Sequence, residues 1–294
     1  MAESQTSAVA PEAAPGPLTS DPIRVITFNT AVGNPRIKTD QRAFLELPFY
    51  QEIIHGKPGA AILAAQEVGP EQAKALEDAA KDGRFRLVHL QRPGQGNAML
   101  IPARFAVLSQ RSRYVVRGQL VAIVRALWRW LRRQGRPNYR QLAELRMWSE
   151  ASVRDERSSR AFSVFNTHLS ADPDLCVEQA KDVFKRVHAA RRRGPVILAG
   201  DLNTRAVDTP GAPKRPADAA VRGLFDGLSD MGASAHDPGG RPTIDYILAG
   251  GFSPVSARLY TGDSLELPGL PRAEEISDHY AKEASLRFCL APTP

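Results

Sequence analysis

Six hydrophobic runs in this chain each end in polar residues of the kind that bind metal ions or phosphate. A strand buries its apolar residues, so a polar side chain just past its end lies at the rim of the sheet, where ligands bind in open α/β sheets. The residues at these rims are Asn29, Glu67, His168, Asp201 with Asn203, Asp245, and Asp278 with His279. Such a set can hold a divalent cation and activate water, so the pattern predicts a metal-dependent hydrolase.

Glu67 is the first candidate for a metal ligand. It follows the apolar run at residues 62–66, so the chain has just left a strand. Hard cations such as Mg²⁺ take oxygen ligands, and often only one or two protein carboxylates beside the substrate phosphate. The alternative is a glutamate at the start of the following helix, where the helix dipole favours a negative charge. The residue alone leaves both roles open.

Asp201 and Asn203 follow the apolar run at residues 196–200. Gly200 permits close backbone approach, and side chains two positions apart in an extended chain lie on one side. A carboxylate beside a metal can take a proton from water while an amide orients the phosphate. The structural alternative is a turn, because Gly-Asp-x-Asn is a common turn sequence. The strand directly before this stretch favours the catalytic interpretation.

Asp278 and His279 are an adjacent acid and imidazole, which can serve a metal ion and a phosphate together. Asp245 could accept a hydrogen bond from the His279 imidazole and fix its tautomer, or it could be a strand-end aspartate exposed to water. A single strand-end histidine such as His168 is more often structural than catalytic. The adjacent pair is therefore the stronger signal.

Hydrophobic patterns indicate the elements that position these residues. Helical patterns cover residues 70–82 and 174–193, the second with an apolar stripe that ends before a Gly-Pro pair. Residues 205–219 and 261–275 contain Pro and Gly, and we expect them to form loops near the site that contribute to substrate selection. The predicted strands are 23–28, 61–66, 85–90, 97–101, 105–108, 161–167, 195–200, 243–248, 255–259 and 284–288.

Composition indicates one soluble globular domain. Of 294 residues, 43% are hydrophobic and 24% charged, which are ordinary values. The even spread of the six rims favours a single domain over residues 23–290. Residues 1–22 are rich in Ala, Pro, Ser and Glu without periodicity, which predicts a disordered tail and no secretory signal. No apolar stretch approaches the length that spans a bilayer.

The two cysteines, Cys176 and Cys289, cannot form a disulfide framework. Each has apolar neighbours, so we expect each to be a small buried hydrophobic residue. This usage fits a reducing cytoplasm.

Positive charge is concentrated in one segment of the chain. The net charge is +7, but residues 111–160 contain 13 arginines and 4 acidic residues, so the rest sums to −2. Within this segment, residues 119–148 form a predicted basic helical insert. Its predicted arginine face contains Arg125, Arg129, Arg132, Arg133 and Arg136, and its predicted apolar face contains Leu120, Ile123, Val124, Leu127, Trp130 and Leu131.

The insert has three possible roles. It could be a helix packed on the domain with a solvated arginine face. Its arginines could instead bind a nucleic-acid backbone. Alternatively, tryptophans flanked by arginines near residues 119–136 could lie in an anionic membrane interface and bring phospholipid headgroups to the site.

Seven short motifs occur in the order FNT, QEV, GNAML, FNTHL, GDLN, IDYIL and SDH, between about residue 23 and residue 289. In this order they resemble the endonuclease/exonuclease/phosphatase superfamily. The NTHL stretch resembles the branch that contains pancreatic-type deoxyribonucleases, neutral sphingomyelinases, inositol phosphatases and deadenylases. The resemblance implies an α/β fold, a DNase I-like four-layer α/β/β/α sandwich of two packed mixed sheets. It also implies hydrolysis of a phosphate ester with Mg²⁺ or Mn²⁺.

The resemblance also implies roles for the metal-binding positions. Asn29 and Glu67 match positions that bind or support the metal, and Asp278 matches one that joins the metal site.

Five further positions match catalytic ones. Asp201 would activate or orient the water, and Asn203 and His168 would contact the scissile phosphate. His279 would stabilise the pentacovalent transition state with Asp245 as its partner.

Two departures from the superfamily pattern concern the phosphate surroundings. Thr243 stands where a basic residue often precedes Ile-Asp-Tyr, with Arg241 two positions earlier. The stretch after GNAML, usually Ser-Arg-Phe-Pro, is longer here and spans residues 101–106. The departures leave the substrate open, and the metal-site positions are unaffected.

The predicted function is therefore a divalent-metal phosphodiesterase, with nucleic acid as the first substrate class. A second possibility is a phosphatase or phospholipase C-like hydrolase acting on a phospholipid, sugar phosphate or nucleotide. A third is a catalytically inactive protein that binds polyanions through the basic helix. Clustered carboxylates are costly to keep together, which counts against the inactive protein.

Overall fold

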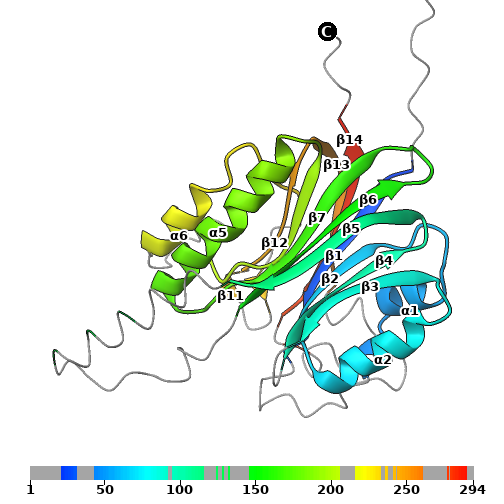
Figure 1. Ribbon diagram of the computed structural model, residues 1–294, viewed down its shortest axis with the longest axis horizontal. Helices are drawn as coiled ribbons and strands as arrows, with labels where there is room; N and C mark the ends of the chain where they lie inside the picture. Colours follow the sequence, from blue (N-terminus) through cyan, green and yellow to red (C-terminus); the bar gives the residue numbers. More distant parts are fainter. Residues whose placement is uncertain are drawn as a thin grey trace, which may run out of the picture.

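The computed structural model describes residues 21–31, 43–91, 95–115, 124, 128, 132, 146–205, 216–232, 236–237, 241–242, 244–260, 277 and 279–289. Two six-stranded sheets form the centre of this part of the chain (Figure 1). Asp278, nearly all of the predicted tail, most of the predicted insert and the predicted loop 261–275 lie outside the described residues.

The first sheet has the strand order β13–β14–β1–β2–β4–β3. Strands β1 and β2 are parallel, and all other neighbours in this sheet are antiparallel. Its strands are β1 (Ile23–Asn29), β2 (Ile62–Val68), β3 (Phe85–Gln91), β4 (Gly96–Pro102), β13 (Phe252–Tyr260) and β14 (Ala281–Phe288).

The second sheet has the order β5–β6–β7–β8–β12–β9, in which only β7 and β8 are parallel. Its strands are β5 (Phe105–Tyr114), β6 (Met147–Asp155), β7 (Ala161–His168), β8 (Val196–Asp201), β9 (Ser229–Asp230) and β12 (Asp245–Gly250). A short separate ribbon pairs β10 (His236–Asp237) with β11 (Arg241–Pro242).

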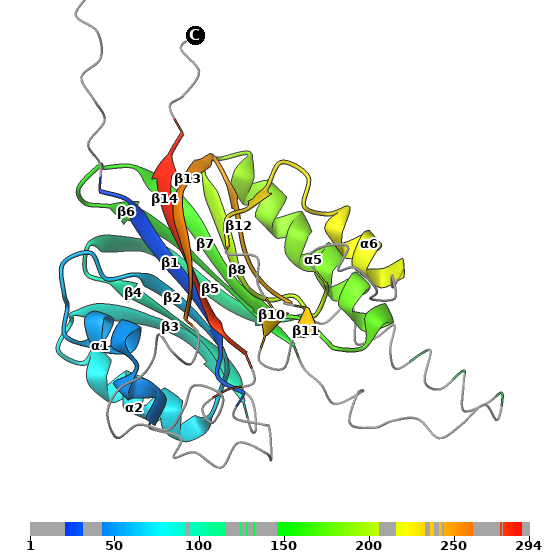
Figure 2. The same ribbon diagram turned by 180° about the vertical axis from the view of Figure 1, so that it is seen from behind.

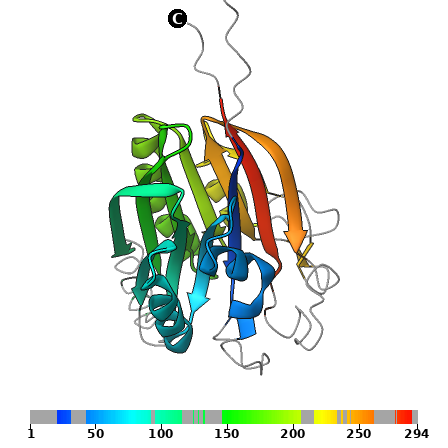
Figure 3. The same cartoon turned by 90° about the vertical axis from the view of Figure 1, so that its right-hand side faces the viewer.

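Helices cover the outer face of each sheet. Figures 1 and 2 show α1 (Pro48–Ile54) and α2 (Pro70–Ala80) beside the first sheet, and α5 (Pro173–Arg191) and α6 (Pro216–Arg222) beside the second. The 3₁₀ helix η1 (Ala43–Glu46) precedes α1. Figure 3, turned by a quarter, shows the two sheets next to each other. This arrangement is the predicted four-layer α/β/β/α sandwich of two mixed sheets.

Three apolar clusters hold the layers together. Ile62 and Ile197 lie in the cluster between the sheets. Leu76 of α2 belongs to the cluster on the outer face of the first sheet, and Phe184 of α5 belongs with Leu198 to the cluster on the outer face of the second. Because β8 is covered on both faces, its residues are apolar without interruption instead of alternating with polar ones. Such uninterrupted apolar runs allow the central strands to be predicted from the sequence.

The two helices predicted from the sequence occur at nearly the predicted positions. α2 begins with Pro70, and the side chain of Gln72 accepts a hydrogen bond from the Gly69 N–H at 2.9 Å. α5 begins after Asp172, whose carboxylate accepts hydrogen bonds from two N–H groups of the first turn. These caps satisfy donors that have no partner within a helix.

Several elements differ from the sequence prediction. Strand β6 was not predicted, and it begins at Met147, so the last two residues of the predicted insert belong to the second sheet. Its side chains alternate between buried and partly exposed over part of its length, without the continuous apolar run that marked β8. Helices α1 and α6 were not predicted either, because each has only 7 residues.

The two cysteines differ in burial. Cys176, in α5, is buried as predicted, but the prediction for Cys289 is wrong, because this residue is exposed. Cys289 follows the last residue of β14, where its N–H donates to the Gly251 carbonyl.

Three positions of the insert are described. Val124 and Trp128 are helical, and the Arg132 N–H donates to the Trp128 carbonyl at 3.0 Å. The Arg132 guanidinium stacks on the Trp128 ring, 3.4 Å from its centroid. Within the described part of the chain, no helix is long and apolar enough to cross a membrane.

Candidate active site

Three of the predicted site residues lie in one row across the second sheet. His168, at the end of β7, pairs in register with Asp201, at the end of β8, and Asp201 pairs with Asp245, at the start of β12. All three side chains are buried. The register therefore places an imidazole and two carboxylates side by side at the rim of this sheet.

Gly200 brings β8 close to β7 just before Asp201. Its φ is 149°, and a Cβ atom there would lie 2.0 Å from the Thr167 carbonyl oxygen. No side chain fits at that distance, so glycine is required for the close approach of the two strands. This explains why the apolar run of β8 ends in Gly-Asp.

The first sheet contributes Asn29 and Glu67 from the ends of two parallel strands. Asn29, the last residue of β1, pairs with Gln66 of β2, and Glu67 comes next. The β2–β4 register shifts between Ala65 and Val68, and Glu67 has a positive φ of 54°. Such a bulge re-aims a side chain, and strained backbone of this kind is concentrated at functional sites.

Contacts between these residues cross from one sheet to the other. The Asn29 amide donates to the Asp201 carboxylate at 3.0 Å. The Nε2 atom of His168 lies 3.4 Å from Asp201 Oδ2 and 3.8 Å from Glu67 Oε1. Residues from four strands thus converge at one edge of the sandwich, where the carboxyl ends of β1, β2, β7 and β8 meet.

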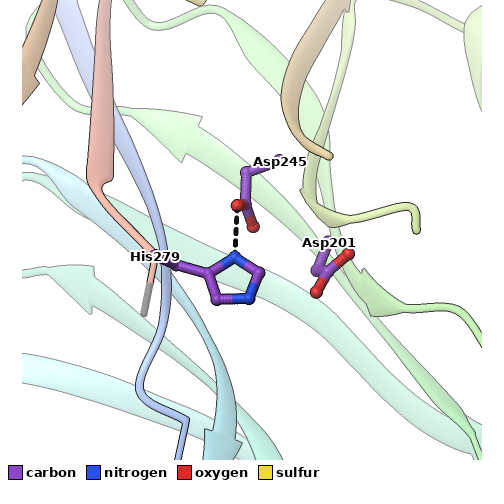
Figure 4. A group of neighbouring side chains, drawn as sticks. All are labelled: Asp201, Asp245 and His279. Carbon is purple, nitrogen blue, oxygen red and sulfur yellow. Dashed lines mark hydrogen bonds and ion pairs between the residues drawn. The ribbon is translucent and has the colours of Figure 1, made fainter. Parts of the chain in front are cut away.

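His279 and Asp245 form a dyad beside Asp201 (Figure 4). The Nδ1 atom of His279, just before β14, lies 2.7 Å from Asp245 Oδ2, as the sequence predicted. Ligand atoms of Asp201, Asp245 and His279 all lie within 4.8 Å of one another. The Ser277 hydroxyl donates to the Asn29 carbonyl at 2.6 Å and so ties the segment before β14 to the end of β1.

The Asp201 carboxyl is the most perturbed acid of this cluster. Burial, together with the negative charge of Asp245, raises the pKa of Asp201 to about 7, although His279 and two hydrogen bonds oppose the shift. Two adjacent buried carboxylates repel each other unless a cation or a proton compensates them. The donor set, with Glu67 from the first sheet beside it, therefore fits a divalent cation bound by oxygen ligands.

Asn203 forms a turn around the end of β8. Its N–H donates to Asp201 Oδ1 at 2.8 Å, and its side-chain amide donates to the Leu169 carbonyl at 2.8 Å. Its φ is +48°. The turn that was the structural alternative for this motif is therefore present, and it also holds the Asp201 carboxylate in place.

A model of the endonuclease/exonuclease/phosphatase family matches residues 26–279. The chain belongs to this family. Its members are generally phosphoester hydrolases, and the match covers every predicted site residue, including Asp278, which lies outside the described residues. No curated protein sequence matches the chain.

Solved structures similar to this family member share its fold at low sequence identity. One is the D. rerio protein TDP2 complexed with a single-strand DNA product, which is 15% identical (TM-score 0.64; 92% of this chain, 100% of that one). Another is the human Nocturnin catalytic domain with a bound sulfate anion, which is 19% identical (TM-score 0.61; 92% and 94%). A third is the mannosyl-6-phosphatase Bt3783 of Bacteroides thetaiotaomicron VPI-5482, which is 15% identical (TM-score 0.55; 90% and 100%).

Arg146 is a site residue of this family member that sequence reasoning missed. It is buried, and its Nη1 atom lies 2.8 Å from Nδ1 and 3.0 Å from Nε2 of His168. It immediately precedes β6, an element that was not predicted, so nothing marked it among the arginines of the insert. A buried guanidinium beside His168 adds positive charge where a phosphate group would lie.

A layer of buried amides beneath the site was also missed. Gln66 of β2 donates to Asn166 of β7 at 2.8 Å, and the Asn166 amide donates to the carbonyls of Ala65 and Ala98 at 2.9 Å each. Buried polar groups of this kind are costly unless paired, so their pairing fixes how the two sheets face each other. The positions of the site residues depend on how the two sheets are held together.

Proposed function

We propose that this protein is a divalent-metal-dependent phosphodiesterase. The observation that supports it most directly is the buried cluster of Asp201 with the Asp245–His279 dyad, whose ligand atoms lie within 4.8 Å of one another. The members of the family to which the chain belongs are generally phosphoester hydrolases. The metal and the substrate class are part of the proposal.

We propose Glu67, Asn29 and Asp278 as the residues that hold the metal, with Mg²⁺ or Mn²⁺ as the ion. A bound divalent cation neutralises charge on the phosphoryl oxygens and lowers the pKa of a coordinated water. Glu67 lies within reach of the cluster, 3.8 Å from His168, and Asn29 donates to Asp201. The carboxylate and amide oxygens match the ligands that such hard cations prefer.

The protein side chains would divide the reaction as follows. Asp201 orients the attacking water and accepts its proton as the new bond to phosphorus forms. Asn203 and His168 contact the scissile phosphate. His279, held by Asp245, donates a hydrogen bond to the phosphoryl oxygens as the bond to the leaving oxygen breaks. The leaving oxygen then takes a proton from solvent.

Nucleic acid is the first substrate class to test. The structural neighbour TDP2 was solved with a single-strand DNA product, and its structure aligns with 92% of this chain. The buried Arg146 beside His168 supports a phosphodiester anion as the group bound. Because the cysteines fit a reducing compartment, we propose that the enzyme acts in the cytoplasm.

A phospholipid is the second candidate substrate, and a specific observation favours it. Val124 and Trp128 of the insert are exposed large hydrophobic side chains. A nucleic-acid backbone gains little from an exposed valine, whereas a lipid surface can bury it.

A hydrolysis screen tests the proposed activity. The full chain is assayed with bis(p-nitrophenyl) phosphate, DNA, RNA, nucleotides, sugar phosphates and phospholipid vesicles, each with Mg²⁺, with Mn²⁺ or with chelator. We expect phosphodiester cleavage that the chelator abolishes. Binding of polyanions without cleavage under any of these conditions would support the catalytically inactive alternative.

The role of Glu67 in metal binding is tested by Glu67→Gln. Because the substitution keeps the size but removes the charge, the Mn²⁺ concentration for half-maximal activity should rise at least about tenfold while the fold is retained. Glu71→Gln is the matched control, since Glu71 lies in the first turn of α2 and fills the alternative role of a helix-terminal acid. Equal Mn²⁺ titrations for Glu67→Gln and the wild type would remove Glu67 from the metal site.

A further inference from the structure

The described residues of the insert expose apolar surface on consecutive helical turns. Val124 is 62% exposed and Trp128 is 52% exposed. Among the residues that the structure describes, Leu108 and Val255 are the other exposed large hydrophobic residues. Val124 belongs to the face predicted to be apolar, and the sandwich does not cover it. A helix packed on the domain by that face would have buried this side chain.

The exposed residues are of the types expected at a membrane interface. Val124, Trp128 and Arg132 are spaced four residues apart and therefore lie on one side, so the predicted placement of Val124 and Arg132 on different faces is wrong. Along this line the side chains change from aliphatic to aromatic to cationic, with Arg132 stacked on Trp128. A helix that lies in a membrane interface turns one side toward the lipid, where valine and tryptophan enter the acyl boundary and a long arginine side chain reaches the headgroups. We call these three residues the insert surface.

The charge of the surrounding sequence complements an anionic surface. Residues 116–145 contain seven arginines and one acidic residue, while the rest of the chain outside residues 111–160 has a net negative charge. Each basic side chain near an anionic membrane contributes favourably to binding. The local charge therefore attracts the same kind of surface that the exposed apolar residues would enter.

The insert leaves and rejoins the fold beside the active site. The Val115 N–H donates to the Arg146 carbonyl at 2.9 Å, and Tyr114 pairs with Met147 in the β5–β6 register. Arg146 in turn contacts His168. A surface bound by the insert is thus tethered to the rim where the scissile phosphate would lie.

We propose that the insert surface binds the surface of an anionic phospholipid membrane and holds the active-site rim against its headgroups. The inference rests on the proposed function for one part only, namely that a phospholipid ester is the bond cleaved. Docking itself requires no catalysis. A nucleic-acid backbone would use the arginines but would leave Val124 in water, so the exposed apolar side chains favour the membrane.

Vesicle cosedimentation of the full chain tests the proposal. Vesicles of phosphatidylcholine alone are compared with vesicles containing about one third phosphatidylserine, in chelator so that no hydrolysis occurs. We expect binding to the anionic vesicles. The double variant Val124→Ser/Trp128→Ser should bind at least about tenfold more weakly, whereas Trp128→Phe should retain most of the affinity because an aromatic ring remains. Val255→Ser is the control, since it removes another exposed valine, from β13, and should leave binding unchanged.

Each outcome of this experiment decides the proposal. No binding of the wild type to anionic vesicles would overturn it, as would an equal loss for Val255→Ser. If the double variant binds vesicles normally but loses affinity for single-stranded DNA, the partner is nucleic acid. Hydrolysis of bis(p-nitrophenyl) phosphate with Mn²⁺ is measured in parallel and should be unchanged in the double variant. Vesicle binding without any such hydrolysis would support docking and count against the proposed activity instead.

Discussion

His279 and Asp245 act on the same chemical step in the proposed mechanism, because one positions the other. Their contact at 2.7 Å joins β12 to the segment before β14. Asp245→Asn and His279→Ala should each lower the rate about a hundredfold or more, the usual scale for positioned acid–base groups. The double variant should lose much less than the product of the two losses, since the carboxylate has no function without the imidazole. Steady-state rates on bis(p-nitrophenyl) phosphate measure this, and fully multiplicative losses would show that the residues act separately.

At the same residue scale, the types of the site residues were predictable, but most of their contacts were not. Asp245 with His279 was predicted because an acid and an imidazole at strand ends suggest a tautomer-fixing pair. The contact of Asn29 with Asp201 joins residues 172 positions apart and depends on how the sheets face each other. Arg146 could not be told apart from the other arginines of the insert, because its burial is set by tertiary packing alone.

At the scale of elements, the approach of β8 to β7 depends on a single glycine. A Cβ atom at Gly200 would lie 2.0 Å from the Thr167 carbonyl oxygen. Gly200→Ala should therefore lower the free energy of unfolding by at least about 3 kcal/mol, or prevent folding, because backbone atoms cannot move aside as a flexible side chain can. Gly194→Ala is the control, since nothing lies within 4 Å of its Cβ position. Urea unfolding curves of the two variants make the comparison, and equal midpoints would contradict it.

The elements themselves were predictable where burial on both faces produces an uninterrupted apolar run. Strands β2 and β8 have this pattern, as each is covered by the other sheet on one side and by a helix on the other. Strand β6 mixes buried and partly exposed positions and follows the arginine-rich insert, so no hydrophobic periodicity marked it as a strand in the sequence. The type of an element could therefore be predicted from its local burial pattern. How the two sheets pack could not, because it depends on contacts between residues far apart in the sequence.

Across the whole molecule, buried carboxylates occur in two opposite electrostatic environments. Glu283 is buried, which alone would raise its pKa, but hydrogen bonds from Arg24 and Tyr260 outweigh burial and lower the pKa. That carboxylate stabilises the fold above its ordinary pKa, and its contribution is lost as the pH falls through the lowered value. Asp201 has the opposite shift. The scaffold therefore pairs its carboxylates with cations, whereas the active site concentrates negative charge that a bound cation would neutralise.

This opposition predicts how stability depends on pH and metal. In the metal-free protein the raised pKa of Asp201, about 7, means that the folded state binds more protons than the unfolded state between pH 3.8 and about pH 7. Its contribution to stability is therefore lost as the pH rises towards 7, by up to about 4 kcal/mol. Asp201→Asn should remove this loss and therefore raise the melting temperature more at pH 8 than at pH 5. Mn²⁺, which requires deprotonated ligands, should raise the wild-type melting temperature more at pH 8 than at pH 5. Calorimetry at both pH values, with chelator or with Mn²⁺, measures all four differences. A metal effect that is larger at pH 5 would show that the buried Asp201 carboxyl is not what the cation compensates.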